Sequence, residues 1–469
     1  MKRIAVLTLL ITIAIPSLWA EDLKVGRAAV KITPPVGSVM GNSYGIKVSK
    51  GIHDDLFAKA LVLEANGNKA ALVACDLISI RGAIISEARR LIEEQTDLRG
   101  DQVIISATHA HAGPQMHPLF LKAVGGEPEK LSLEYIRELP KLIAKSIQLA
   151  EADLSPARAS VGRVYEDSII SNRRFLMADG TVEMNPGRNN SDVIRPVGPV
   201  DPQVSVLYFE SLDGEPLATL VNYSLHVAIV GGDEFSADYP AVLSRLLKQI
   251  KGEDMLTIFT NGTSGNVNNS YSDLSQGDPL RGHAEAARVG TILAASVLKA
   301  YAHLQPVEPA PLHVRADKVQ LPISAVTAQE AEWAHDIMAG NGQPNGPKFT
   351  DVVRAWRIID LASLNGGPLV SEVQAITLGN QVALVGFPGD AFVELGLSIK
   401  TNSPFPFTIV SEQSANGAIS YVPNRKAFPE GDYEVISARF EPGGAELLVE
   451  AAVRLLTDLF PYHEAASTP

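Results

Sequence analysis

Short apolar runs alternate along this chain with longer stretches in which apolar residues recur at helical spacing. The short runs predict strands over residues 25–32, 57–65, 69–76, 103–107, 203–209, 217–223, 256–260, 373–378 and 381–386. Helical spacing predicts helices over residues 81–95, 133–149, 239–250, 283–303, 392–400 and 445–459, the second of them bent at Pro140. Buried strands that alternate with amphipathic helices favour an α/β fold, in which mixed β-sheets are flanked by helices.

Turn and loop signals divide these elements without marking a domain boundary. Asp213-Gly214 and Gly379-Asn380 are each typical of a tight turn between neighbouring strands. Residues 185–202 and 340–347 are rich in Pro and Gly and are interpreted as loops over a site. No segment repeats and none has low complexity, so we expect a single domain over residues 21–469.

The first twenty residues have the layout of a secretory signal peptide. Met1-Lys2-Arg3 is a basic start, residues 4–15 are almost entirely apolar, and Ala20 precedes the acidic Glu21. The apolar run is shorter than the ~20 residues that span a bilayer, which argues against a stable membrane anchor. We therefore expect a signal peptide over residues 1–20 and a secreted or periplasmic protein. The alternative is a buried N-terminal strand or helix.

Composition and charge exclude several classes of function. The 469 residues include 40 Lys and Arg and 53 Asp and Glu, which gives a formal charge of −13. An acidic chain without a basic cluster repels a phosphate backbone, so nucleic acid is not an expected partner. The single cysteine, Cys75, can form neither an intramolecular disulfide nor a thiolate metal cluster. A small-molecule or lipid-like substrate is expected instead, and the sequence does not indicate an oligomeric state.

Two histidines directly follow the apolar strand predicted over residues 103–107. His109 and His111 are two residues apart, so in an extended chain both side chains address the same point. Ligands in α/β sheets gather outside the carboxyl ends of strands, and imidazole is the commonest metal ligand. A metal site is one interpretation of this pair. The other is two loop histidines that hydrogen-bond to the backbone.

Four further segments contain polar side chains that are candidates for a site, three of them at the ends of predicted strands. His226 follows one strand, and residues 261–269, rich in Asn and Gly, follow another, where backbone N–H groups can approach a substrate. Asp390 lies between a strand and a helix, and Tyr421 lies in a late apolar run. Each also has an ordinary structural interpretation: a polar turn for residues 261–269, a helix cap for Asp390, and a core tyrosine for Tyr421.

Taken in order, these segments resemble the neutral/alkaline ceramidase family. The resemblance rests on Thr-His-x-His-x-Gly-Pro, a strand-end His, a Gly-Asn loop, Phe-Pro-x-Asp and Ser-Tyr-Val, at residues 108–114, 226, 265–269, 387–390 and 420–422. The opening strand at residues 26–34, the segment 51–60 and the pair Asn172-Arg173 fit the same family. The resemblance extends from about residue 25 to residue 433. We therefore expect a ceramidase-like catalytic domain, here without the C-terminal β-sandwich with which neutral ceramidases continue.

The resemblance implies one Zn²⁺ and a set of residues around it. The implied metal ligands are His109, His226, Asp390 and Tyr421. The implied catalytic or substrate-contacting residues are His111, Arg173, Asn268 and Tyr433. Zinc with an open coordination position can hold a water whose pKa falls to ~7, and the resulting hydroxide attacks a carbonyl carbon.

Two positions depart from the family pattern. The family has a serine, proposed as nucleophile, where this chain has Asn268. It also has Glu where this chain has Asp390, one methylene shorter. These departures argue against ceramide as the substrate, although the fold and the metal site are expected to be shared.

The leading hypothesis is an exported zinc-dependent hydrolase that uses a metal-bound water to cleave an amide, ester or lactone. Three alternatives stay open: ceramidase activity itself, hydrolysis of a polar sugar-type substrate, and a non-catalytic binding protein that retains the fold. A serine hydrolase with Ser264 as nucleophile is disfavoured, because no Gly-x-Ser-x-Gly elbow is present.

Overall fold

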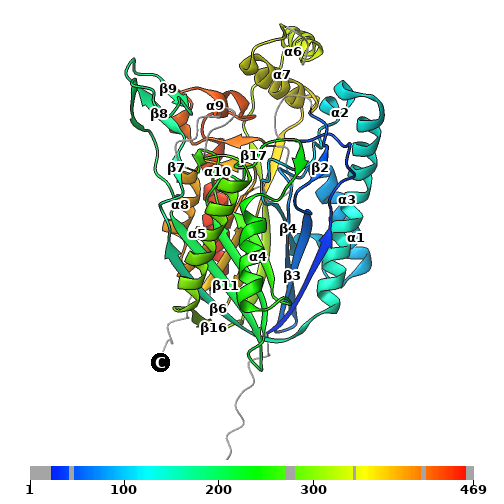
Figure 1. Cartoon of the computed structure of the whole chain (residues 1–469), viewed down its shortest axis with the longest axis vertical. Coiled ribbons are helices and arrows are strands. Elements are labelled where there is room, and N and C mark those ends of the chain that lie inside the picture. Colours follow the sequence, from blue (N-terminus) through cyan, green and yellow to red (C-terminus); the bar gives the residue numbers. More distant parts are fainter. Residues whose placement is uncertain (1–22, 42–46, 270–279, 342–344, 413–418, 461–469) are drawn as a thin grey trace, which may run out of the picture.

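Two β-sheets lie face to face, and helices cover the outer face of each. The computed structural model describes residues 23–41, 47–269, 280–341, 345–412 and 419–460, so the predicted signal peptide lies outside the described residues. The resulting order of layers is helices, large sheet, small sheet, helices, and Figure 1 shows α4 and α5 in front of the large sheet. The expected α/β class, with mixed sheets flanked by helices, is confirmed.

The large sheet has nine strands and is antiparallel except near its two edges. Its order is β14 (Leu256–Asn261), β12 (Pro216–Tyr223), β11 (Gln203–Ser211), β6 (Ser155–Tyr165), β1 (Lys24–Lys31), β3 (Phe57–Ala65), β4 (Asn68–Cys75) and β5 (Val103–Ala107), with β16 (Gln305–Val307) paired to β6. The pairs β12–β14 and β4–β5 are parallel. Since the strands of these two pairs are buried on both faces, they are continuous apolar runs in the sequence.

This sheet turns a corner, and the corner positions the site. β1 and β6 pair only through Lys24–Pro156 and Val25–Ser155. The edge strand β14 contacts β3, β4 and β5 from the other half of the sheet. As a result, the segment after β12 lies against the segment after β5, where the His111 N–H donates to the Val227 carbonyl at 2.9 Å.

The small sheet has four strands and belongs to the C-terminal part of the chain. Its order is β17 (Leu312–Leu321), β18 (Leu369–Leu378), β19 (Val382–Gly386) and β21 (Phe407–Ser411), of which only β19 and β21 are parallel. Leucine and isoleucine side chains from both sheets form the apolar layer between them, including Leu61, Leu220, Ile376 and Leu384. Burying these side chains against each other removes them from water, at ~25 cal/mol per Å² of apolar surface.

Long amphipathic helices bury one face each against the sheets. The large sheet is covered by α1 (Gly82–Gln95), α3 (Gly126–Ala152), α4 (Tyr239–Lys251) and α5 (His283–Tyr301). The small sheet is covered by α8 (Val393–Asn402) and α10 (Gly444–Leu459). None of the helices in the described ranges is long and apolar enough to cross a membrane.

Shorter elements gather at one end of the sheets, at the top of Figure 1. They are α2 (Pro118–Val124), α6 (Ala328–Gly340), α7 (Phe349–Ala362), α9 (Tyr433–Ser437), β2 (Gly51–Ile52), β7 (Ser171–Asn172), β8 (Arg174–Met177) and β9 (Val182–Met184). The remaining short strands are β10 (Val193–Pro196), β13 (Glu234–Phe235), β15 (Val267–Asn268), β20 (Asp390–Ala391) and β22 (Tyr421–Val422). The chain at this end consists of connections between strands and helices, which is where ligands bind in α/β folds.

The predicted elements agree with the observed ones, usually within a few residues at each end. The helix predicted over residues 133–149 is longer, because α3 extends from Gly126 to Ala152 with Pro140 inside it. The predicted loop over residues 185–202 contains the strand β10, and part of the loop at 340–347 lies outside the described residues. Both predicted turns are present, with Gly214 and Gly379 at positive φ of 87° and 55°.

Candidate active site

His109 lies two residues beyond the end of β5, and the backbone fixes its ring. Its φ is 69°, a left-handed conformation that turns the chain sharply after the strand. The ring is buried, and Nδ1 lies 2.8 Å from the Ile78 carbonyl oxygen. A carbonyl can only accept, so Nδ1 donates, and a ring that carries its proton on Nδ1 alone presents a lone pair at Nε2.

His226 follows β12 and is held in the same way. Its Nδ1 lies 3.1 Å from the Ser264 carbonyl oxygen, so this nitrogen also donates. Burial, together with His109 and Arg173, holds the pKa of His226 well below its usual value. The ring is therefore neutral, and its Nε2 presents a lone pair as well.

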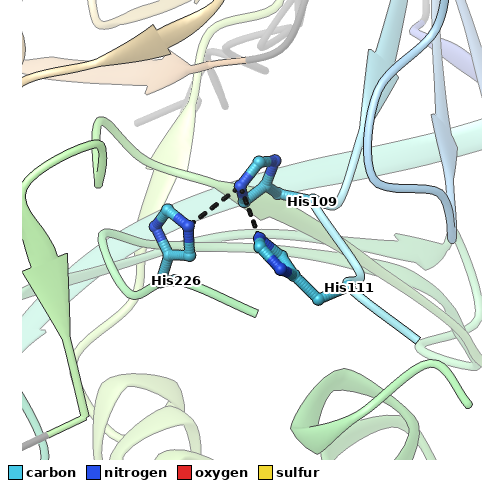
Figure 2. Close-up of side chains that lie close together, drawn as sticks. All are labelled: His109, His111 and His226. Atoms are coloured by element: carbon cyan, nitrogen blue, oxygen red, sulfur yellow. Dashed lines mark hydrogen bonds between the residues drawn. The ribbon is translucent and has the colours of Figure 1, made fainter. Parts of the chain in front are cut away.

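Three imidazoles converge on one point, and we name them the three-histidine cluster: His109, His111 and His226 (Figure 2). Nε2 of His109 is 3.0 Å from Nε2 of His226 and 3.1 Å from Nε2 of His111. The first of these contacts brings two lone pairs together, which is unfavourable unless a cation lies between them. Burial, His109 and the arginines Arg173 and Arg281 hold the pKa of His111 well below its usual value.

Asp390 brings a carboxylate to the same point. Its Oδ1 is 3.2 Å from His109 Nε2, and this buried oxygen has no hydrogen-bond donor among the described residues. The preceding Gly389 has a φ of 69°, and a Cβ there would lie 2.5 Å from the Ser420 carbonyl oxygen. Only glycine permits this approach, which lets β20 pair in parallel with β22 and places Asp390 opposite Tyr421.

Tyr421 and Tyr433 stand beside Arg173. The two tyrosine rings have centroids 5.1 Å apart, and the Arg173 guanidinium carbon is 5.3 Å from the Tyr421 centroid. Burial raises the pKa of Tyr421, and Arg173 partly opposes that rise. Tyr433 begins α9, whose cap is Asp432, and reaches the site from the end of the molecule shown at the top of Figure 1.

Arg173 is positioned by a buried carboxylate. Its Nε donates to Glu434 Oε1 at 2.9 Å, while the neighbouring Arg174 donates from Nη1 to Glu434 Oε2 at 2.7 Å. Arg173 Nη1 also reaches Asn268 Oδ1 at 3.4 Å, and Asn268 Nδ2 donates to Asn185 Oδ1 at 3.1 Å. The remaining nitrogen, Nη2, has no partner among the described residues, so it is available to an oxygen of a bound molecule.

One cavity of about 480 Å³ contains all eight predicted site residues in its lining: His109, His111, Arg173, His226, Asn268, Asp390, Tyr421 and Tyr433. Ser264 is not in this lining, since its hydroxyl lies in the interior against Glu412. Other residues of the wall were not predicted, chiefly Arg81, Arg281, Trp356, Asp360 and Arg439. Of these, only Trp356 and Asp360 share a local signal, the i, i+4 spacing that brings side chains together on a helix.

The donor set fits a divalent transition metal. Three imidazole nitrogens and one unpartnered carboxylate oxygen meet in a buried place, and nitrogen and oxygen donors of this kind suit Zn²⁺. The family resemblance implies a role for His111 outside the set of ligands. The structure places its Nε2 as close to His109 as that of His226, so all three rings face the same point.

A second group of possible ligands lies outside the cavity. His53, Glu234 and His283 lie near one another, with the two imidazole rings stacked at a centroid distance of 3.6 Å. His53 and Glu234 are exposed, in contrast to the buried His109 and His226. A measurement of the metal content of this protein therefore has to distinguish metal bound at the three-histidine cluster from metal bound by His53, Glu234 and His283.

Comparison with known proteins points to one family. Residues 23–237 match the family "Neutral/alkaline non-lysosomal ceramidase, N-terminal". The neutral ceramidase of Pseudomonas aeruginosa is 28% identical over 218 residues, which are 44% of this chain and 31% of that protein. The neutral ceramidase of Drosophila pseudoobscura pseudoobscura is 28% identical over 202 residues, which are 41% of this chain and 26% of that protein. The matched segment thus spans about a third or less of the length of these relatives.

Solved structures extend the likeness in fold to nearly the whole chain. The crystal structure of neutral ceramidase from Pseudomonas aeruginosa superimposes with a TM-score of 0.71 at 20% identity, over 94% of this chain and 75% of that one. A structure described as ceramidase complexed with C2 gives 0.71 at 19% identity, over 94% and 76%. At this identity the likeness shows the fold. Residues 23–237 are therefore similar to the N-terminal part of the neutral/alkaline non-lysosomal ceramidase family, and the likeness in fold extends over nearly the whole chain.

Proposed function

We propose that this protein is an exported zinc-dependent hydrolase that cleaves an amide, ester or lactone bond. The observation that carries the proposal is the meeting of the His109 and His226 Nε2 lone pairs 3.0 Å apart, beside an unpartnered Asp390 oxygen. Such an arrangement is costly to bury unless a cation joins the groups. Similarity to the ceramidase family supports the same class of reaction.

Hydrogen bonds separate the metal ligands from the neighbouring histidine. A ligating histidine almost always donates its other ring N–H to a fixed acceptor. His109 and His226 do so, to Ile78 and Ser264. His111 makes no such bond to a carbonyl or carboxylate among the described residues, and the one hydrogen-bond contact of its ring there is with His109, at 3.1 Å. We assign His109, His226, Asp390 and Tyr421 to the metal and His111 to proton transfer.

The other residues act on the substrate carbonyl. Zinc bound at this site supplies Lewis-acid activation of water and of a carbonyl oxygen. Arg173 presents its unpartnered Nη2 to the oxygen that becomes negative, held in place by Glu434. Tyr433 stands next to Tyr421 and offers a phenol to the leaving group or to the oxyanion. Asn268, held between Arg173 and Asn185, orients the substrate.

Two further functions are supported by specific observations. The curated relatives are neutral ceramidases, which favours ceramidase activity as the second candidate. Asn185, Asn268 and Asn269 line the cavity, which favours a polar sugar-type substrate as the third. A binding protein without catalysis has only the Asn at position 268 in its favour.

The experiment combines metal analysis with hydrolysis. Purified wild type should carry zinc and release acid from an N-acyl amide or ester, whereas His109→Ala should lose both properties. His303→Ala, at an exposed histidine outside the cavity, is the matched control and should retain them. Wild type without zinc would contradict the proposal, and release of fatty acid from ceramide would identify the second candidate. Export is tested separately, by sequencing the N-terminus of the protein recovered outside the cytoplasm.

A further inference from the structure

The cavity carries excess positive charge, although the chain as a whole is acidic. Four arginines and two aspartates line it: Arg81, Arg173, Arg281, Arg439, Asp360 and Asp390. Arg173 is paired with Glu434 and Arg439 with Asp360, while Asp390 faces the three-histidine cluster. Within the described ranges, the side chains of Arg81 and Arg281 have no ion pair or hydrogen bond, in a chain of net charge −13.

Arg81 lies at the N-terminus of α1, where the helix backbone adds a partial positive charge to that of the guanidinium. It is the residue before the first turn of α1, where no side chain caps the helix and no acidic residue follows in the first turn. The N-terminus of a helix carries a partial positive charge and favours an anion. Burial lowers the pKa of Arg81, and Asp360 opposes that effect only in part.

The carboxylate of Asp360 acts on Arg81 only through its charge, because its hydrogen bonds within the described residues go to other side chains. Asp360 Oδ2 accepts hydrogen bonds from Trp356 Nε1 and Arg439 Nε, each at 2.9 Å. Asp360 Oδ1 lies 3.2 Å from His117 Nε2. These bonds fix Arg439 at the cavity wall beside Arg81. One carboxylate therefore serves two guanidinium groups, and one positive charge is left over.

Three aromatic rings in the lining of the cavity form a row that ends at Tyr421, opposite Asp390. The Phe349 and Tyr433 centroids are 5.4 Å apart, and those of Tyr433 and Tyr421 are 5.1 Å apart. The row leads along the cavity to Arg173 and Asp390. It provides an apolar flank for the organic part of a substrate between the two ends.

We propose that Arg81, with Arg439 beside it at the N-terminus of α1, binds an anionic group of the substrate. The group is a carboxylate, phosphate or sulfate, attached through a short organic linker to the bond that is cleaved at the three-histidine cluster. This inference rests on the proposed hydrolase function only for the cleavage. It identifies the substrate class as negatively charged amides or esters, in contrast to a neutral lipid such as ceramide.

The test measures binding separately from turnover, with the full-length protein. N-hexanoylglycine, its uncharged amide and inorganic phosphate are titrated calorimetrically into wild type, Arg81→Gln and Arg81→Lys. Arg137→Gln, at an exposed arginine of α3 outside the cavity, is the matched control. We expect wild type to bind the carboxylate at least about tenfold more tightly than the amide, because a charge-assisted hydrogen bond is lost in the amide. Arg81→Gln should abolish that preference, Arg81→Lys should restore part of it, and Arg137→Gln should keep it.

Each result decides the proposal. Preference for phosphate over the carboxylate, if lost in Arg81→Gln, supports it and identifies a phosphorylated substrate. Equal binding of acid and amide by wild type, a preference that survives in Arg81→Gln, or no binding of any anion overturns it. Hydrolysis of the same acid and amide is followed in parallel. Preferential binding of the acid without turnover of either compound would contradict the hydrolase function and support the anion site. Equal turnover of the acid and the amide would support the hydrolase function and contradict the anion site.

Discussion

The Ser264 hydroxyl donates a hydrogen bond to Glu412 Oε1 at 2.7 Å, and both side chains are fully buried. Glu412 also accepts from the backbone N–H groups of Ser264 and Ala391, at 2.9 and 3.1 Å. The serine therefore holds the loop after β14 to the end of β21, and it does not face the cavity. Its role is structural.

Replacing Ser264 by Ala should lower stability and leave the chemistry intact. The variant loses the bond to Glu412 and the bond that the hydroxyl accepts from Asn261 Nδ2 at 3.0 Å, which should cost about 1–3 kcal/mol of unfolding free energy. Urea denaturation measures this, and Ser168→Ala, at an exposed serine, should stay within about 0.5 kcal/mol of wild type. The hydrolysis rate of folded Ser264→Ala should stay within about threefold, or roughly 0.7 kcal/mol, of wild type. A far greater loss in a folded variant would make Ser264 a nucleophile.

Removal of metal should destabilise the wild type and have no effect on His109→Ala. In wild type, the His109 and His226 lone pairs meet at 3.0 Å once the cation is gone, whereas the alanine variant has only one of them. A ligand at 100 times its Kd adds about 2.7 kcal/mol to stability. Thermal unfolding with a chelator and with added zinc measures the shift in Tm.

The control for this experiment is His53→Ala, at the exposed group with Glu234 and His283. This variant should show the same zinc-dependent rise in Tm as wild type. If the rise disappears in His53→Ala and persists in His109→Ala, the metal that stabilises the protein is at the surface.

Replacing Glu434 by Ala should be strongly destabilising. It is the shared partner of Arg173 and Arg174, and the three side chains are all buried. Removing one member of a buried ion pair costs about 3–5 kcal/mol, because a buried charge is left without compensation. Here that charge is on Arg173, since Arg174 keeps its ion pair with Glu430. Urea denaturation should show this loss, with Glu87→Ala on the exposed face of α1 near zero. A change below about 1 kcal/mol would show that water replaces the carboxylate.

Asp238 should make stability fall as the pH rises from 4 to 6. Burial raises the pKa of this carboxyl to about 6, although backbone N–H groups of Val230, Tyr239 and Ile229 oppose the rise. Between the unfolded and folded pKa values, the folded state binds the extra proton, so its advantage is complete at low pH and is lost on deprotonation. The advantage amounts to about 3 kcal/mol, for a shift of roughly two units.

Urea denaturation of wild type and Asp238→Asn at pH 4, 5, 6 and 7 measures this effect. The stability of wild type relative to the variant should decrease by about 3 kcal/mol over the range and stay constant above it. An unchanging difference between the two proteins would show that Asp238 titrates in the folded protein as it does in the unfolded chain.

Elements that are apolar on both faces could be predicted because the hydrophobic pattern alone defines them, as in β4 and β5. β6 and β17 were missed for the opposite reason. β6 is rich in Ala, Ser and Gly, which have low strand propensity, and β17 alternates through Arg, Asp, Lys and Gln on a half-exposed surface. The pairing partners of both strands lie far away in the sequence, where no local pattern reveals them.

The site residues also divide into those that a local sequence pattern predicts and those that it does not. His109, His226 and Asp390 could be predicted because each follows a recognisable strand, and Tyr421 because the order of all four resembles a known family. The Arg439–Asp360 pair and Arg81 were not found. Their significance depends on side chains that meet only after folding, and a single arginine in a loop has no signature of its own.

The site combines residues from two parts of the chain that are synthesised at different times. His109 and His226 come from segments that follow strands of the large sheet, whereas Asp390 and Tyr421 come from the C-terminal part of the chain. During synthesis the two histidines emerge from the ribosome before Asp390 and Tyr421, so at that stage only half of the proposed metal ligands are present. Under the proposed function, tight binding of zinc therefore requires that the C-terminal part has packed onto the large sheet, so zinc uptake would measure the completion of folding.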